Sequence, residues 1–163
     1  TQPGFIGEFQ QSYRNNLGED EALRIQPLKT MLRRGICVGF GTDYPVISPS
    51  PALGIESAIT RREREGRAVL NPGERISFQE ALRCYTENNA YAAGTEALQG
   101  SLRTGSFADF VVLGERWEEL CDGFAGFTVL RTVIGGETVY QGAGGSLPDG
   151  AVQLRNDEKE GEA

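Results

Sequence analysis

The chain has 163 residues, of which 39% are hydrophobic, and it carries a net charge of −7. This length suits one domain or slightly more, the acidic charge argues against a nucleic-acid partner, and no apolar run approaches the roughly 20 residues of a membrane span. Because residues 1–4 also lack the basic start and apolar core of a secretory signal, we expect a cytoplasmic protein with no membrane partner.

The N-terminal half is predicted to consist of helices around one strand. Residues 27–34 have the pattern of a short helix, with Gly35 just past its end. Residues 36–42 (ICVGFGT) are apolar without alternation, which predicts a strand covered on both faces. Asp43 follows at the carboxyl end of that strand, where α/β enzymes place catalytic groups. The alternative is that Asp43 serves in a turn or as a helix cap.

Two further helices are predicted. The first covers residues 51–66, and its charged end, residues 61–65 (RRERE), is interpreted as a solvated helix face. Within it, Arg61 is expected to form a surface or structural ion pair, with substrate binding as the alternative. The second helix begins at the capping box Ser77-Phe78-Gln79-Glu80 and runs to residue 93, before Gly94.

The pattern changes to strands after residue 100. Residues 108–113 and 127–134 are predicted strands, and Gly135-Gly136 is a predicted hairpin turn into residues 137–140. Asp109 is expected to have a structural role at the start of the first of these strands. We therefore divide the chain into a helical module over 1–100, a small sheet over 101–142 and a flexible acidic tail over 143–163.

One parallel-type strand cannot form a sheet alone. The helical module is therefore expected to pair with strands that this chain does not contain. The edges of residues 36–40 would otherwise stay unpaired, and the isolated chain would then aggregate or form homo-oligomers.

The sequence contains no histidine and three widely separated cysteines, Cys37, Cys84 and Cys121. None of them forms a C-x-x-C pair, so a zinc site made from cysteine and histidine is excluded. We expect three reduced thiols without a catalytic role, because the chain has no histidine base to activate one.

Five sequence blocks follow one another in an order that resembles a known family. The blocks are residues 41–46 (GTDYPV), 58–61 (AITR), 81–86 (ALRCYT), 100–113 (GSLRTGSFADFVVL) and 132–136 (TVIGG). This order is similar to the C-terminal third of the YtcJ-like branch of the amidohydrolases (amidohydrolase family three), and the resemblance covers about residues 2–140. Gln2-Pro3 and Tyr85-Thr86 narrow the resemblance to this branch.

The resemblance implies an α/β fold and a metal-dependent reaction. Residues 1–100 would be the C-terminal portion of a (β/α)8 metal-dependent hydrolase barrel, and residues 101–142 a small β-sandwich (composite) domain. Asp43 would end the eighth strand, with Gln2-Pro3 just after the seventh on the same face. In the family this aspartate binds or faces a divalent metal, expected to be zinc, and takes a proton from the attacking water. The expected reaction is hydrolysis of carbon–nitrogen bonds, other than peptide bonds, of a small-molecule substrate.

The sequence departs from the family in one respect. The metal-binding histidines of the family precede the matched region and are absent here, and a complete barrel needs about 250 residues. We therefore expect the isolated chain to bind no catalytic metal and to be inactive without the missing N-terminal portion. The alternatives are a non-catalytic truncated remnant and a subunit that completes a barrel with a second chain.

Overall fold

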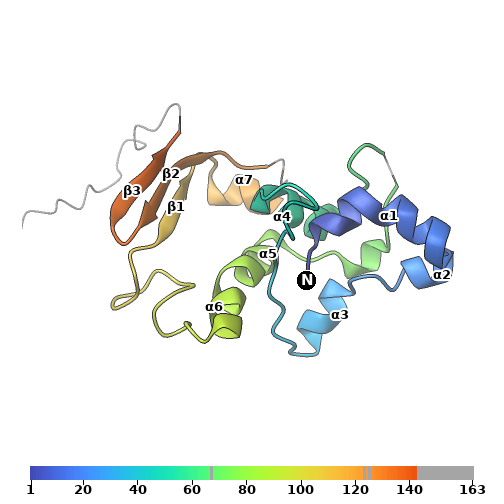
Figure 1. The fold of residues 1–163 in the computed structure, drawn as a ribbon, viewed down its shortest axis with the longest axis horizontal. Helices are drawn as coiled ribbons and strands as arrows, with labels where there is room; N and C mark the ends of the chain where they lie inside the picture. The colour runs from blue at the N-terminus through green and yellow to red at the C-terminus, as the bar shows by residue number, and fades with distance from the viewer. Residues whose placement is uncertain (67, 123, 125, 143–163) are drawn as a thin grey trace, which may run out of the picture.

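The computed structural model describes residues 1–66, 68–122, 124 and 126–142. The predicted tail, 143–163, lies outside the described residues. The elements, in chain order, are α1 (Gly4–Leu17), α2 (Glu19–Ala22), α3 (Leu28–Arg33), α4 (Pro51–Thr60), the 3-10 turn η1 (Pro72–Glu74), α5 (Phe78–Tyr85), α6 (Glu87–Ala93), β1 (Phe110–Leu113), α7 (Trp117–Asp122), β2 (Val129–Ile134) and β3 (Glu137–Gln141). Helices α1 to α6 gather together, and the sheet lies at one end of the molecule (Figure 1).

The helical part has one hydrophobic core, which includes Ile6, Ile55 and Phe78. Helix α1 approaches α4 closely because it carries glycine at the contact. A Cβ atom on Gly7 would lie 2.8 Å from the hydroxyl of Ser57 in α4. Among the described residues, no helix has the length and apolar character needed to cross a membrane.

The predicted helices are confirmed in part. The Ser77 hydroxyl accepts a hydrogen bond from the Glu80 amide and the Glu80 carboxylate accepts one from the Ser77 amide, so the predicted capping box is present. The helix that follows is nevertheless two helices, because Thr86 leaves the helical conformation (φ −115°, ψ −89°). The prediction of one helix over 51–66 is wrong after Thr60, since Arg61 adopts a left-handed conformation (φ 52°) that ends α4.

The strand predicted over residues 36–42 is absent from the described structure. The segment lacks the neighbouring strands that a ladder requires. Its burial also differs from the expectation: Val38 and Phe40 are buried, whereas Cys37 and Gly41, which alternate with them, are exposed, so one face is covered rather than two.

The backbone of this segment nevertheless has partners on both edges. The amino group of Thr1 donates to the Gly39 carbonyl (2.8 Å), and the Gly41 amide donates to the Thr1 carbonyl (3.0 Å). These two bonds have the pattern of a parallel strand pair. On the other edge, the Phe40 amide donates to the Cys84 carbonyl (3.0 Å) and the Asn89 side chain donates to the Phe40 carbonyl (2.8 Å). The expectation that residues 36–40 have unpaired edges is therefore wrong for residues 39 and 40.

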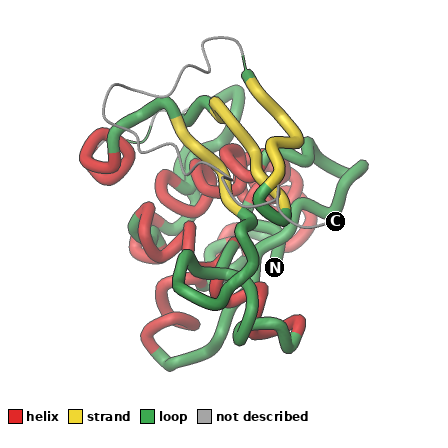
Figure 2. Tube along the Cα trace, turned by 90° about the vertical axis from the view of Figure 1, so that its left-hand side faces the viewer, coloured by secondary structure: helices red, strands yellow, loops and turns green. Residues whose placement is uncertain are grey.

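The C-terminal strands form an antiparallel sheet in the order β1-β2-β3. Figure 2 shows these strands side by side, on the side of the helices that faces the viewer. Gly135 and Gly136 have φ values of 59° and 83° and make the predicted hairpin turn. Asp109 accepts a hydrogen bond from the Gly135 amide (2.7 Å), which is the structural role expected of it. Helix α7 was not predicted; the Trp117 ring lies 5.4 Å from the Phe78 ring, so α7 packs against the start of α5.

Candidate functional site

Asp43 lies at the carboxyl end of the extended segment, as the sequence predicted. The residue is exposed and has a left-handed backbone (φ 57°), and its carbonyl accepts a hydrogen bond from the Val46 amide (2.8 Å). Its backbone therefore makes a turn. Its carboxylate has no hydrogen bond or ion pair with any described residue, so it is free to contact a ligand.

Gln2 lies at the same end of the neighbouring segment. Since Thr1 pairs with Gly39 and Gly41, the parallel register places Gln2 beside Gly41. A Cβ atom on Gly41 would meet no described atom within 4 Å, which leaves open space next to the backbone. Gln2, Gly41 and Asp43 thus line one open edge, and the structure brings together the two ends that the sequence predicted to share a face.

Among the described residues, Asp43 supplies the one carboxylate placed at this edge. A catalytic zinc site uses three protein ligands, commonly histidine or carboxylate. The described residues contain no group of three histidine, cysteine, aspartate or glutamate side chains that could hold a metal ion. The oxygen chemistry of Asp43 fits one position in such a site, and the other ligands must come from elsewhere.

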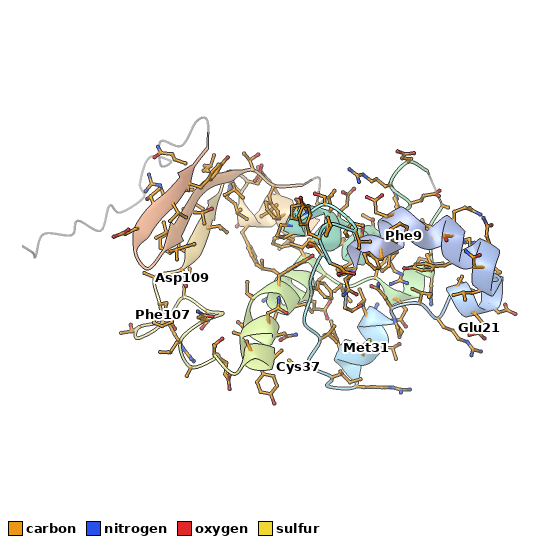
Figure 3. All side chains as sticks on the ribbon, in the orientation of Figure 1. Phe9, Glu21, Met31, Cys37, Phe107 and Asp109 are labelled. Atoms are coloured by element: carbon orange, nitrogen blue, oxygen red, sulfur yellow. The ribbon has the colours of Figure 1, made fainter. Side chains whose placement is uncertain are left out.

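The cysteines do not extend the site. All three are free; Cys37 and Cys121 are exposed and Cys84 is buried. Burial raises the pKa of the Cys84 thiol to about 11, so it stays protonated near neutral pH. Figure 3 shows Cys37 near α6, on the segment that leads to Asp43.

Arg61 does not lie on a solvated helix face. Its side chain is completely buried, and it donates hydrogen bonds to the carbonyls of Leu70 (2.5 Å), Gln26 (3.0 Å) and Ile25 (2.9 Å). Burial lowers the pKa of Arg61 to about 10, while the charge of Glu74 acts in the opposite direction. Among the described residues Arg61 has backbone carbonyls as partners and no ion pair, so the expected ion pair is wrong.

Gln26 connects Arg61 to the open edge. The side-chain amide of Gln26 donates to the Gln2 carbonyl (2.9 Å), while the Gln26 carbonyl accepts from Arg61. Gln26 was not predicted as a site residue. Its left-handed conformation (φ 45°) and its contact across 24 residues leave no local sequence signal.

A separate cavity of about 690 Å³ lies between α5, α6 and β1. Its walls include Leu82, Tyr85, Phe107 and Val111. Phe107 and Asp109 lie between the helices and the sheet (Figure 3). Burial raises the pKa of Tyr85 to about 12, and its buried hydroxyl has no hydrogen-bond partner among the described residues. Asp43 is not one of the residues that line this cavity.

Comparison with known proteins identifies a family whose members are similar to this chain. A model of the amidohydrolase family matches residues 2–140. The chain is 34% identical over 125 residues to N-substituted formamide deformylase of Arthrobacter pascens (76% of this chain, 23% of the relative). It is 32% identical over 142 residues to LONG AFTER FAR-RED 3 of Arabidopsis thaliana (86% and 24%). It is 31% identical over 144 residues to YtcJ of Bacillus subtilis, named as an amidohydrolase (86% and 27%).

The chain therefore spans about a quarter of the length of these curated relatives. Among solved structures, a metal-dependent hydrolase from Pyrococcus furiosus is similar, with 35% sequence identity and a TM-score of 0.54. That likeness covers 66% of this chain and 21% of the other. A metal-dependent hydrolase from Pyrococcus horikoshii, at 21% identity and a TM-score of 0.53, shares the fold over 80% of this chain and 23% of its own.

Proposed function

The chain belongs to the amidohydrolase family, and from this membership we propose that it forms the C-terminal part of a metal-dependent hydrolase. The proposed enzyme cleaves carbon–nitrogen bonds, other than peptide bonds, of a small molecule. The observation that carries the proposal is the free Asp43 carboxylate at the carboxyl end of a segment paired in parallel with Thr1. That is the position of catalytic groups in parallel α/β folds.

The proposed architecture follows from the same pairing. Residues 1–100 would complete a (β/α)8 barrel, with Thr1 ending one strand and residues 36–42 forming the next. Residues 101–142 would form a small β-sandwich with strands from outside this chain. The exposure of Val111, Val139 and Tyr140 supports this, because a sheet with exposed apolar side chains on its strands is commonly covered by another layer.

The proposed role of Asp43 is proton transfer. Its carboxylate would accept a proton from the attacking water and donate it to the leaving nitrogen, which departs as a neutral amine. A divalent metal, with zinc the expected ion, would lower the pKa of a bound water to about 7. Asp43 would also be one ligand of that metal.

The substrate proposal is an N-substituted amide. It is supported by the relative from Arthrobacter pascens, whose name specifies N-substituted formamides. The proposed partner is the polypeptide that supplies the remaining metal ligands. Because the described residues offer no complete ligand set, the second candidate is a non-catalytic remnant that never receives them.

The test is to produce the chain together with the polypeptide encoded directly upstream of Thr1. Bound zinc would be measured by mass spectrometry, and formate release from an N-alkylformamide would be followed. At least one metal ion per complex and formate release that a chelator stops would support the hydrolase. A purified complex without metal would reject it and favour the remnant.

A further inference from the structure

Gln2 has a fixed backbone and an unpaired side chain. Its carbonyl accepts hydrogen bonds from the Phe5 amide (3.1 Å) and from the Gln26 side chain (2.9 Å). The residue before it is held by the pairing of Thr1 with residues 39–41, and the residue after it, Pro3, is fully buried. The Gln2 side-chain amide itself makes no hydrogen bond to any described residue. The carboxamide donor and acceptor of Gln2 are therefore available to a ligand at this edge.

The position of Gln2 depends on a network behind it. The carbonyl of Gln26 accepts from both Arg61 (3.0 Å) and the Leu28 amide (2.8 Å). Gln26 and Asp43 are two of the four described non-glycine residues with positive φ. Such conformations persist only where the surroundings fix them, and they concentrate at functional sites. The buried guanidinium of Arg61 thus fixes Gln26, and Gln26 fixes the Gln2 backbone.

We propose that Gln2 binds the amide group of the substrate beside Asp43, and that Gln26 is a positioning residue for Gln2. A carboxamide side chain carries a donor and an acceptor. It can donate to the substrate carbonyl and accept from the substrate N–H, whereas an ester of the same shape lacks the N–H. The substrate class is therefore a secondary amide rather than an ester. This inference rests on the proposed function.

The experiment is an NMR titration of the isotope-labelled chain in its complex with the upstream polypeptide. The probes are N-methylformamide and its ester counterpart, methyl formate. We expect saturable shifts of the Gln2 side-chain NH₂ signals and of the Asp43 amide signal, with the weaker affinity for methyl formate. Gln2→Leu removes the donor and the acceptor at nearly constant volume. It should weaken binding of N-methylformamide about 30-fold, since it removes two hydrogen bonds that contribute about 1 kcal/mol each and every 1.4 kcal/mol is tenfold.

Two further variants keep the result interpretable. Gln11→Leu is the matched control, because Gln11 is an exposed glutamine of α1 whose side chain bonds, within the described part of the chain, only to Asn15. It should leave the affinity unchanged. Gln26→Leu should weaken binding about 3-fold at a temperature where the variant is still fully folded, which a purely structural role would not produce.

Two results would overturn the inference: no saturable shift at Gln2, or equal affinities for Gln2→Leu and Gln11→Leu. If Gln2→Leu does not fold, Gln2→Asn applies the same test with a shorter amide and should also lose affinity. The titration measures binding and needs no turnover. A complex that lacks metal would therefore reject the proposed hydrolase, and the effect of Gln2 on binding could still be measured.

Discussion

Arg61→Met is expected to destabilise the protein strongly. Methionine replaces the long side chain without its charge and keeps a Cβ atom, so the strain of the left-handed backbone stays the same. Three carbonyls lose the guanidinium, but Gln26 keeps its bond from the Leu28 amide. The Leu70 and Ile25 carbonyls have no other hydrogen bond among the described residues. Each unsatisfied buried group costs about 1–3 kcal/mol.

The sum for two carbonyls is about 2–6 kcal/mol, and removal of the buried charge offsets part of this loss. Against a typical stability of about 5–15 kcal/mol, the variant should still fold. The free energy of unfolding would be measured by urea titration at pH 7. Arg62→Met is the matched control, because Arg62 is exposed, and it should change stability by about 0.5 kcal/mol or less. Equal losses in the two variants would refute the role of Arg61 as a buried hydrogen-bond centre.

The remaining predictions concern buried groups near the core. Under native conditions at pH 8, Ellman's reagent should label the exposed Cys37 and Cys121 rapidly and the buried Cys84 only in urea; three equal rates would contradict the packing of α5. The folded pKa of Tyr85, about 12, lies above the unfolded value of 10, so its contribution to stability is complete below pH 10 and is lost as pH rises to about 12. The urea midpoint of unfolding should therefore fall between pH 10 and pH 12, and it should fall less in Tyr85→Phe. An equal fall of the midpoint in both proteins would argue against burial of the hydroxyl. Gly54→Ala should cost about 1–3 kcal/mol despite a helix-propensity gain of about 1 kcal/mol, because its Cβ would overlap the Tyr85 hydroxyl. The loss should shrink in the Tyr85→Phe background, and a stabilised Gly54→Ala would contradict the contact.

The features that could be predicted from the sequence are local ones. The capping box at Ser77 and the hairpin at Gly135-Gly136 need only a few neighbouring residues to form, and both are present. The short apolar run before Asp43 likewise predicts its position at the end of an extended segment.

The features that could not be predicted depend on distant contacts. The apolar pattern of residues 36–42 predicts a strand within a sheet. Its observed hydrogen bonds are instead made with Thr1 and with residues of α5 and α6. The charged run around Arg61 predicts a solvated side chain, but the left-handed backbone of Arg61 directs the side chain into the core. The bond from Gln26 to Gln2 joins residues 24 apart and has no pattern in the sequence.

The central claim is that Asp43 is the proton-transferring carboxylate of a carbon–nitrogen hydrolase. The most direct test compares Asp43→Asn with Asp20→Asn in the metal-loaded complex of the chain with its upstream polypeptide. Asp20 is an exposed aspartate of α2 without an ion pair among the described residues. We predict that kcat for formate release from an N-alkylformamide falls about 10²- to 10⁴-fold in Asp43→Asn and is unchanged in Asp20→Asn. Equal turnover by the two variants would contradict the claim.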